Sequence, residues 1–226
     1  MAFPDLADRI AEARERIRGA VERGGHGQDV TIIGVTKTHG PEAVHAAWEA
    51  GLRDVGENKV QEALGKMKSV DVPVRWHLIG HLQRNKVKAL EHFVMLHALD
   101  SSRLADAVCK FGIDAGRAVD VLVEMNLSGE ESKGGFRESE LRAEAERLTT
   151  LAGIRVRGVM TMASFTAGED ELHRTFAAAR AARDVLRDAG HPAEELSMGM
   201  SSDYEIAVEE GATMVRLGTT LFGARE

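Results

Sequence analysis

VTIIGVTK, at residues 30–37, is a run of apolar and β-branched residues that ends in a lysine. Such residues suit a strand, and a run of this length is typical of a strand rather than of a helix. Because the apolar character is nearly continuous, the run predicts a strand covered on both faces, as in parallel sheets. An ammonium at the end of an apolar row is costly to bury. Lys37 therefore either reaches solvent or is a desolvated amine that forms a Schiff base with a carbonyl.

The rest of the chain repeats this pattern, with short apolar stretches alternating with amphipathic helices. We expect strands at residues 30–37, 54–56, 75–79, 94–99, 119–126, 154–160, 196–198 and 213–217. We expect helices at residues 4–24, 41–51, 59–68, 83–90, 101–111, 138–150, 169–189 and 202–210. Such alternation implies right-handed crossovers and a parallel sheet. Eight units preceded by an extra helix favour an α/β fold, a closed (β/α)8 TIM barrel, over an open doubly wound sheet. No linker or charge block marks a boundary, so a single domain over residues 1–226 is expected.

The composition argues against several classes of protein. Hydrophobic residues make up 43% and charged residues 29% of the chain, which is typical of a globular protein. The net charge of −7, with both signs interleaved, argues against nucleic acid as a partner, because phosphate contacts need a basic face. Cys109 provides no disulfide framework and is expected to be an inert core thiol. No segment resembles a signal peptide or a membrane span, so we expect a soluble, cytoplasmic protein that contacts no membrane.

The chemically informative residues fall where this barrel class places its active site, at the carboxyl ends of the strands. These positions are Lys37, residues 56–58, residues 80–81, Asn126, residues 160–162, residues 199–202 and residues 216–219. Ser201 and Ser202 precede a helix, where a hydroxyl caps the helix or holds an anion. Gly218 allows a phosphate to approach the backbone of the next loop closely. Both interpretations of the serines stay open. A phosphate site here would fit a phosphorylated aldehyde bound at Lys37.

Six motifs follow one another along nearly the whole chain, namely VTKT, GENKVQE, WHLIGHLQRNK, SGEESKGG, SMGMSSD and VRLGTTLFGARE. In order and spacing they resemble the pyridoxal phosphate homeostasis protein family. The resemblance implies the barrel of the alanine racemase N-terminal domain, which is the fold type III barrel of pyridoxal phosphate proteins. It also implies that pyridoxal 5′-phosphate (PLP) is the cofactor and is held as a lysine Schiff base.

The resemblance also implies roles for individual residues. Lys37 would bind the cofactor aldehyde, and Arg216 would face the pyridine nitrogen. Ser201, Gly218 and Thr219 would hold the phosphate. No residue receives a catalytic role.

Two further residues, Asn58 and Met160, would lie close to the cofactor ring. The departures from the family pattern concern this ring edge and the outer rim. Gly40 stands where the family often has proline, Lys59 stands where tyrosine is frequent, and MASFT at residues 162–166 replaces a proline-containing stretch. These departures do not affect the Schiff-base lysine.

Arg216 also bears on the kind of function. A guanidinium only donates hydrogen bonds, so it contacts the pyridine nitrogen only when that nitrogen is unprotonated. The ring is then a weaker electron sink than with a carboxylate partner. We therefore predict a monomeric PLP-binding protein that takes part in PLP homeostasis and delivery to apo-enzymes and is not an enzyme. The alternatives are a weak PLP-dependent amino-acid racemase and a cofactor-free Schiff-base aldolase acting on a sugar phosphate. Structurally, Arg216 could instead face interior water or a core carboxylate.

The remaining candidates are interpreted as structural. His77 and His81 have a spacing that binds zinc on a helix, but here they lie on a strand that runs into a loop, so no metal site is predicted. Asp120 and Glu124 are expected to point into the barrel and to form polar pairs there, with a role as acid/base groups as the alternative. The loop at residues 128–135 is expected to be solvated, with a second anion site or a cofactor-transfer path as the alternative.

Overall fold

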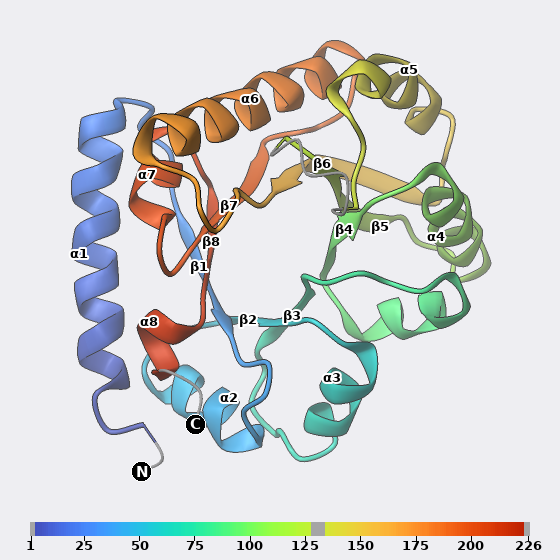
Figure 1. Ribbon diagram of the computed structural model, residues 1–226. Coiled ribbons are helices and arrows are strands. Elements are labelled where there is room, and N and C mark those ends of the chain that lie inside the picture. Colours follow the sequence, from blue (N-terminus) through green and yellow to red (C-terminus); the bar gives the residue numbers. More distant parts are fainter. Residues whose placement is uncertain (1–2, 128–133, 224–226) are drawn as a thin grey trace.

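The computed structural model describes residues 3–127 and 134–223, in which the strands close into a parallel barrel ringed by helices (Figure 1). The strands are β1 (Thr31–Val35), β2 (Asp54–Glu57), β3 (Arg75–Leu78), β4 (Met95–Leu99), β5 (Val119–Met125), β6 (Ile154–Thr161), β7 (Glu195–Met200) and β8 (Met214–Leu217). The helices are α1 (Leu6–Gly24), α2 (Pro41–Glu49), α3 (Val60–Met67), η1 (Arg84–His92), α4 (Ser102–Asp114), α5 (Glu138–Leu148), α6 (Glu169–Asp188), α7 (Tyr204–Glu209) and α8 (Thr219–Phe222). The predicted (β/α)8 TIM barrel with an extra N-terminal helix is confirmed.

The strands are apolar along their length because both of their faces are buried. Ile33 of β1 belongs to the cluster inside the barrel. The other members of this interior cluster are Met95, Ala98, Leu122, Met160 and Met214. The neighbouring residue, Ile32, packs instead in the layer between strands and helices. Burial on both sides explains the continuous apolar runs, since an exposed face would have required alternating polar residues.

Helix α1 packs along the outside of the barrel against α7 and α8 (Figure 1). Its buried stripe consists of Leu6, Ile10, Ala13, Ile17 and Ala20. Gly25 ends the helix in a left-handed conformation, with φ of 68°, which glycine adopts without a steric cost. Ion pairs join Arg16 to Glu205 at 3.3 Å and Arg23 to Glu209 at 2.6 Å. The extra helix thereby links the start of the chain to its last two helices.

Strand β1 is shorter than predicted, and this changes the position of the lysine. The strand ends at Val35, and Lys37 lies in the turn that follows rather than at the end of the strand. Backbone pairing with β2 stops at Thr36, whose N–H donates to the carbonyl oxygen of Gly56 at 3.3 Å. The chain then turns at Thr38, which has a φ of 71°. Lys37 therefore leaves the sheet.

Three helices also differ from prediction. The segment expected as an α-helix at residues 83–90 is the 3-10 helix η1, in which Leu90 is the buried residue. Helix α7 begins at Tyr204 rather than Ser202, because Asp203 accepts the N–H of Met200 at 2.6 Å and extends the preceding turn. The short helix α8 was not predicted, since four residues are too few to show a periodicity.

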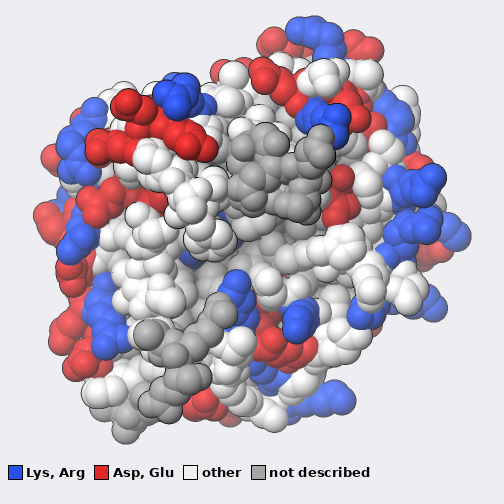
Figure 2. All heavy atoms as spheres, in the orientation of Figure 1, with Lys and Arg blue, Asp and Glu red and all other residues white. Residues whose placement is uncertain are grey.

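Charges of both signs are interleaved on the face of the molecule shown in Figure 2. Lys and Arg stand beside Asp and Glu around the periphery, whereas the residues nearer the centre are mostly uncharged. Exposed ion pairs of this kind contribute roughly 0–1 kcal/mol each, so they support the fold only weakly. Within the described ranges, the chain has no helix that combines the length and the apolarity required to span a membrane.

Candidate functional site

The residues that the resemblance connects with a cofactor lie at one end of the barrel. Each is at or beside the carboxyl end of its strand: Lys37 after β1, Asn58 after β2, Met160 in β6, Ser201 after β7, Arg216 in β8, and Gly218 and Thr219 after β8. Strands β6, β7, β8, β1 and β2 are consecutive neighbours in the barrel. These residues therefore share one arc of the rim, as predicted, and their roles stay predictions.

Lys37 lies in a strained turn. Its side chain is half-buried, and the next residue, Thr38, has a φ of 71°. This left-handed conformation is unfavourable for a β-branched residue by about 1–3 kcal/mol. The N–H of Thr38 donates to Oε1 of Glu62 at 2.5 Å. Strain of this kind persists only where surrounding contacts impose it, so the turn holds Lys37 in a defined place.

A buried ion pair supports that turn. Nζ of Lys66 donates to the carbonyl oxygen of Thr36 and to Oε1 of Glu57, both at 2.6 Å, and to Oε1 of Glu62 at 3.0 Å. Oγ1 of Thr36 donates to the same Oε1 of Glu57 at 2.5 Å. Burial raises the pKa of Glu57, and the hydrogen bonds from Lys66 and Thr36 oppose that rise. The network thus connects β2 and α3 to the backbone on both sides of Lys37.

This network was missed by sequence reasoning. Glu62 and Lys66 have the i, i+4 spacing of an ordinary surface pair on a helix. A signal was nevertheless present, because the motif GENKVQE contains both Glu57 and Glu62. Only the packing of α3 against β2 shows that Lys66 is buried, with 6% of its surface exposed.

Ser201 joins the loops that follow β7 and β8. Its Oγ accepts hydrogen bonds from the N–H groups of Gly218 at 3.3 Å and Thr220 at 3.2 Å. Oγ1 of Thr220 donates to the carbonyl oxygen of Ser201 at 3.4 Å. Ser201 does not cap α7, because Asp203 occupies the position before that helix. Thr219 opens α8 between the two N–H groups, so hydroxyls and backbone donors gather where a phosphate can bind.

Arg216 is almost completely buried, with its guanidinium held by neutral oxygens. Nη1 donates to the carbonyl oxygen and to Oγ of Ser197, both at 2.6 Å, and Nη2 donates to the carbonyl oxygen of Thr161 at 2.9 Å. Burial lowers the pKa of Arg216 to about 10, against the attraction of Asp203 and Glu124. The group is therefore still protonated at neutral pH. Within the described residues its hydrogen bonds go to these neutral acceptors rather than to a core carboxylate.

Met160 and Asn58 differ in accessibility. Met160 is 1% exposed and packs in the interior cluster with Ile33 and Leu122. Asn58 is half-buried and immediately follows β2. Met160 therefore forms part of an apolar floor below the rim, whereas Asn58 lies at the rim itself. Their contact with a cofactor ring stays a prediction.

The two histidines of WHLIGH have separate partners. His77 lies inside the barrel between Asp54 and His97, with both distances at 2.9 Å. His81 is exposed in the loop after β3, where its Nδ1 is 2.5 Å from Oδ2 of Asp100. Across residues 3–127 and 134–223, no group of three or more potential metal ligands forms.

The two carboxylates of β5 also have different environments. Asp120, on the same strand face as the interior residue Leu122, forms a polar pair with the half-exposed Arg155 at 2.6 Å near the amino end of β5. Glu124 is 9% exposed. Burial and the charge of Asp100 raise the pKa of Glu124 to about 7, although Arg216 opposes the shift. Glu124 is thus a carboxyl group that titrates near neutrality and lies within electrostatic range of Arg216.

Two other expectations concern Cys109 and the loop at residues 128–135. Cys109 is a free, buried thiol in α4, as expected for a core residue. Residues 128–133 of the loop, including Lys133, lie outside the described residues.

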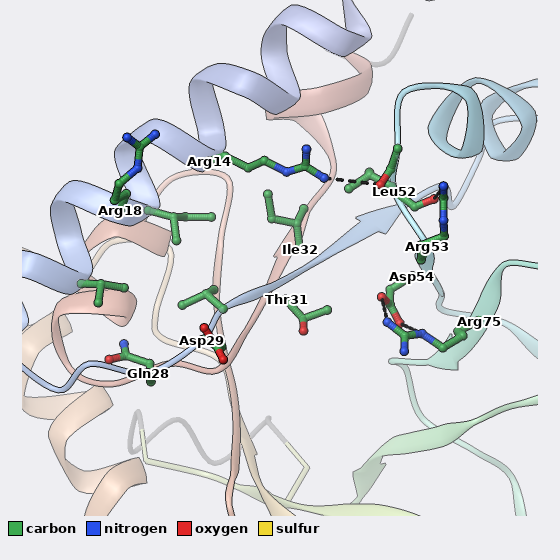
Figure 3. A pocket seen from close by; sticks show the side chains of 14 residues that line it. Arg14, Arg18, Gln28, Asp29, Thr31, Ile32, Leu52, Arg53, Asp54 and Arg75 are labelled. Atoms are coloured by element: carbon green, nitrogen blue, oxygen red, sulfur yellow. Dashed lines mark hydrogen bonds and ion pairs between the residues drawn. The ribbon is translucent and has the colours of Figure 1, made fainter.

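A cavity of about 490 Å³ lies at the opposite end of the barrel, between α1 and the amino ends of β1, β2 and β3 (Figure 3). Charged side chains line it, namely Arg14, Arg18, Asp29, Arg53, Asp54 and Arg75. Arg75 binds Asp54 with two hydrogen bonds, at 2.8 and 2.5 Å, and Arg14 donates to the carbonyl oxygen of Gly51 at 3.3 Å. None of the predicted cofactor residues lines this cavity, so it is not the candidate cofactor site.

Comparison with known proteins finds relatives along the whole chain. The sequence model of the family described as alanine racemase, N-terminal domain, matches residues 8–226. The pyridoxal phosphate homeostasis protein of Aquifex aeolicus is 40% identical, over 98% of this chain and 99% of its own. The protein of the same name from Pseudomonas aeruginosa is 41% identical, over 98% of this chain and 96% of its own.

Solved structures of similar proteins have the same fold as this chain. PipY of Synechococcus elongatus, solved without PLP, has a TM-score of 0.88 and 37% identity, over 96% of this chain and 100% of its own. The structure of PipY with PLP bound has a TM-score of 0.85 and 35% identity over the same shares. Alanine racemase from Corynebacterium glutamicum has a TM-score of 0.73 at 18% identity, over 97% of this chain and 61% of its own, which is a likeness of fold alone.

Replacing Lys66 by methionine is expected to lower the free energy of unfolding by about 3 kcal/mol, because the carboxylate of Glu57 would stay buried without its partner. Denaturant unfolding of Lys66→Met, Glu57→Gln and the double variant measures the effect. The double variant should be more stable than Lys66→Met, since it also removes the orphaned charge. Lys68→Met, at an exposed lysine that follows α3, is the control and should change stability by less than about 0.5 kcal/mol. If the losses of unfolding free energy in the two single variants add up in the double variant, Lys66 and Glu57 are not energetically coupled.

Glu124→Gln is expected to change how stability depends on pH. The pKa of Glu124 is raised from 4.5 to about 7 in the folded protein, so the folded state holds this proton more tightly than the unfolded state. The stabilisation is complete below pH 4.5 and is lost as the pH rises through 7. Glutamine does not titrate. The free energy of unfolding of the variant should therefore rise by roughly 2–3 kcal/mol relative to that of the native protein as the pH goes from acidic to mildly alkaline. Urea unfolding of both proteins across this pH range tests the prediction. If their free energies of unfolding depend on pH in the same way, the pKa of Glu124 is not raised.

Proposed function

Since the chain belongs to the alanine racemase N-terminal domain family and, within it, to the pyridoxal phosphate homeostasis proteins, we propose that it binds PLP as a Schiff base on Lys37 and takes part in PLP homeostasis. The names of its relatives and the PLP-bound structure of PipY support this proposal. The proposal extends to a single cofactor-binding domain over residues 1–226 that acts as a monomer in the cytoplasm. Delivery of PLP to apo-enzymes is its final part.

The observation that carries the proposal is the adjacency of β1 and β8. Gly34 of β1 pairs with Leu217 of β8, and a Cβ placed on Gly218 would lie 3.7 Å from the Cβ of Val35. The strand that leads to Lys37 is therefore beside the strand that leads to the donors around Ser201. An amine and a set of phosphate donors at one rim fit a ligand that carries both an aldehyde and a phosphate.

The residues at the rim fit the three chemical groups of PLP. When bound, PLP supplies an aldehyde for a Schiff base and an electron-withdrawing ring. Lys37 would hold the aldehyde through its Nζ as a Schiff base. Ser201, Gly218 and Thr219 would hold the phosphate. Arg216 would donate to the pyridine nitrogen.

Arg216 supports storage of the cofactor rather than turnover. Its pKa of about 10 keeps the guanidinium charged at neutral pH, and a charged guanidinium has no lone pair to accept a proton. It therefore holds the pyridine nitrogen in the unprotonated form, in which the ring withdraws electrons weakly. A site of this kind binds the aldehyde tightly and gives little help to breaking a Cα–H bond.

A weak amino-acid racemase is the second candidate, and Glu124 is the observation that favours it. Its pKa of about 7 makes this carboxyl a possible general acid or base at neutral pH. Exchange of the Cα hydrogen of an amino acid in deuterated water, at a useful turnover rate and lost in Glu124→Gln, would establish the activity. Absence of exchange in the native protein would remove this candidate.

Lys37→Ala is expected to abolish the visible absorption band that the protein forms with PLP, while the circular dichroism spectrum stays that of the folded chain. In the native protein, borohydride reduction and peptide mapping should place the added mass on Lys37. Lys59→Ala is the matched control, since this lysine directly follows Asn58 at the same rim and is exposed.

The band should survive in Lys59→Ala. A band that persists in Lys37→Ala would show that another amine binds the aldehyde. A native protein that stays colourless with added PLP would remove the proposal and favour the cofactor-free aldolase.

A further inference from the structure

A row of buried polar side chains crosses the barrel interior below the rim. Oδ1 of Asp54 lies 2.9 Å from Nε2 of His77, and Nδ1 of His77 lies 2.9 Å from Nε2 of His97. Nδ1 of His97 lies 2.8 Å from Oγ of Ser197, which accepts a hydrogen bond from Nη1 of Arg216 at 2.6 Å. The row thus runs through β2, β3, β4, β7 and β8. It connects the first residue of β2, at the amino end of the barrel, with the arginine near the rim.

The chemistry of the two ends determines where the protons lie. Arg216 only donates, so Oγ of Ser197 accepts from it and donates its own hydrogen to Nδ1 of His97. A neutral His97 then carries its proton on Nε2 and donates it to Nδ1 of His77. A neutral His77 likewise donates from Nε2 to the carboxylate of Asp54, which only accepts. In this arrangement every donor of Ser197, His97 and His77 meets an acceptor, as buried polar groups require.

The surroundings of the row support this arrangement. Burial lowers the pKa of His97 well below 6.5, and the positive charge of Arg216 acts in the same direction, so His97 is neutral. Burial would raise the pKa of Asp54, but the hydrogen bonds from His77 and Arg75 outweigh it, so the pKa is lowered. Figure 3 shows Arg75 lying against Asp54, with hydrogen bonds of 2.8 and 2.5 Å. Asp54 is therefore an ionised acceptor.

We propose that this row is an oriented hydrogen-bond relay, in which the carboxylate of Asp54 sets the tautomers of both histidines and, through Ser197, the hydrogen bonds that hold Arg216. Ser197, His77 and His97 are then positioning residues, because they act on a ligand only through the arginine. The relay itself exists in the protein without a cofactor. Only its effect on a pyridine nitrogen rests on the proposed function.

The same atoms allow one competing arrangement. A doubly protonated His77 would donate to both Asp54 and His97, and His97 would then donate from Nδ1 to Ser197. Oγ of Ser197 would accept from both His97 and Arg216, and its own hydrogen would have no acceptor within the row. The two arrangements differ by one proton on His77 and by the tautomer of His97, so a measurement of ring protonation distinguishes them.

Nitrogen NMR of the cofactor-free protein with ¹⁵N-labelled histidine reads these proton positions. At neutral pH both His77 and His97 are expected to be neutral, with the proton on Nε2. A proton on Nδ1 of His97, or a doubly protonated His77, would overturn the relay.

Asp54→Asn tests whether the carboxylate sets the direction, because an amide both donates and accepts. The ring resonances of His97, which does not touch residue 54, should shift together with those of His77. Asp120→Asn is the matched control: it removes a carboxylate from a similar cross-strand pair with Arg155, outside the row. The control should leave both rings unchanged. If only the ring resonances of His77 change in Asp54→Asn, then Asp54 affects only the residue that it contacts, and there is no relay.

Arg75→Gln keeps the experiment decisive if Asp54→Asn fails to fold. The side chain of Arg75 is 59% exposed, so its loss should leave the fold intact. Removing this cation raises the pKa of Asp54. The ring resonances of His77 and His97 should therefore change at a higher pH than in the native protein, and both rings should change at the same pH. Rings that respond at separate pH values would overturn the proposal. Because these measurements need no PLP, failure of the relay and failure of PLP binding at Lys37 are separate outcomes.

Discussion

The pairing of β1 with β8 brings the two ends of the chain together, and the rim depends on this closure. Thr31 pairs with Met214, and Gly34 pairs with Leu217. A closed barrel has no edge strand, so every strand has a neighbour on each side and its end is held in place. Helix α1 adds to this closure, because it contacts α7 and α8 on the outside of the barrel. The turn at Lys37 and the donors around Ser201 are adjacent only because the barrel is closed.

The charged side chains buried in this closed barrel restrict the positions of the residues at the rim. A buried ion is costly unless hydrogen bonds satisfy it, and each such bond also restricts geometry. Lys66 meets this requirement with three oxygens around the turn of Lys37. Arg216 meets it with the oxygens of Ser197 and Thr161. The hydrogen bonds that stabilise these buried cations therefore also position the groups that would contact a ligand.

Under the proposed function, this arrangement would favour holding the ligand over transforming it. The strained turn at Thr38 and the network behind it keep Lys37 in place before a ligand arrives, which reduces the entropy lost on binding. Arg216 stays protonated, and a donor of this kind leaves a pyridine ring a weak electron sink. The same barrel occurs in alanine racemase at 18% identity, so the fold alone does not decide between storage and catalysis.

The sequence by itself determined the architecture and the end of the barrel at which the candidate site lies, because both follow from local patterns. Runs such as residues 30–37 report burial on two faces, and their alternation with helices implies a parallel barrel whose functional residues follow the strands. Only the tertiary structure decided the partners. Ser201 contacts the start of α8 instead of capping α7, Lys66 is buried rather than exposed, and His97 meets Ser197 across the barrel. Such contacts depend on which strands become neighbours and on where each strand ends. Local periodicity carries no information about either, since it records only how residues a few positions apart share a face.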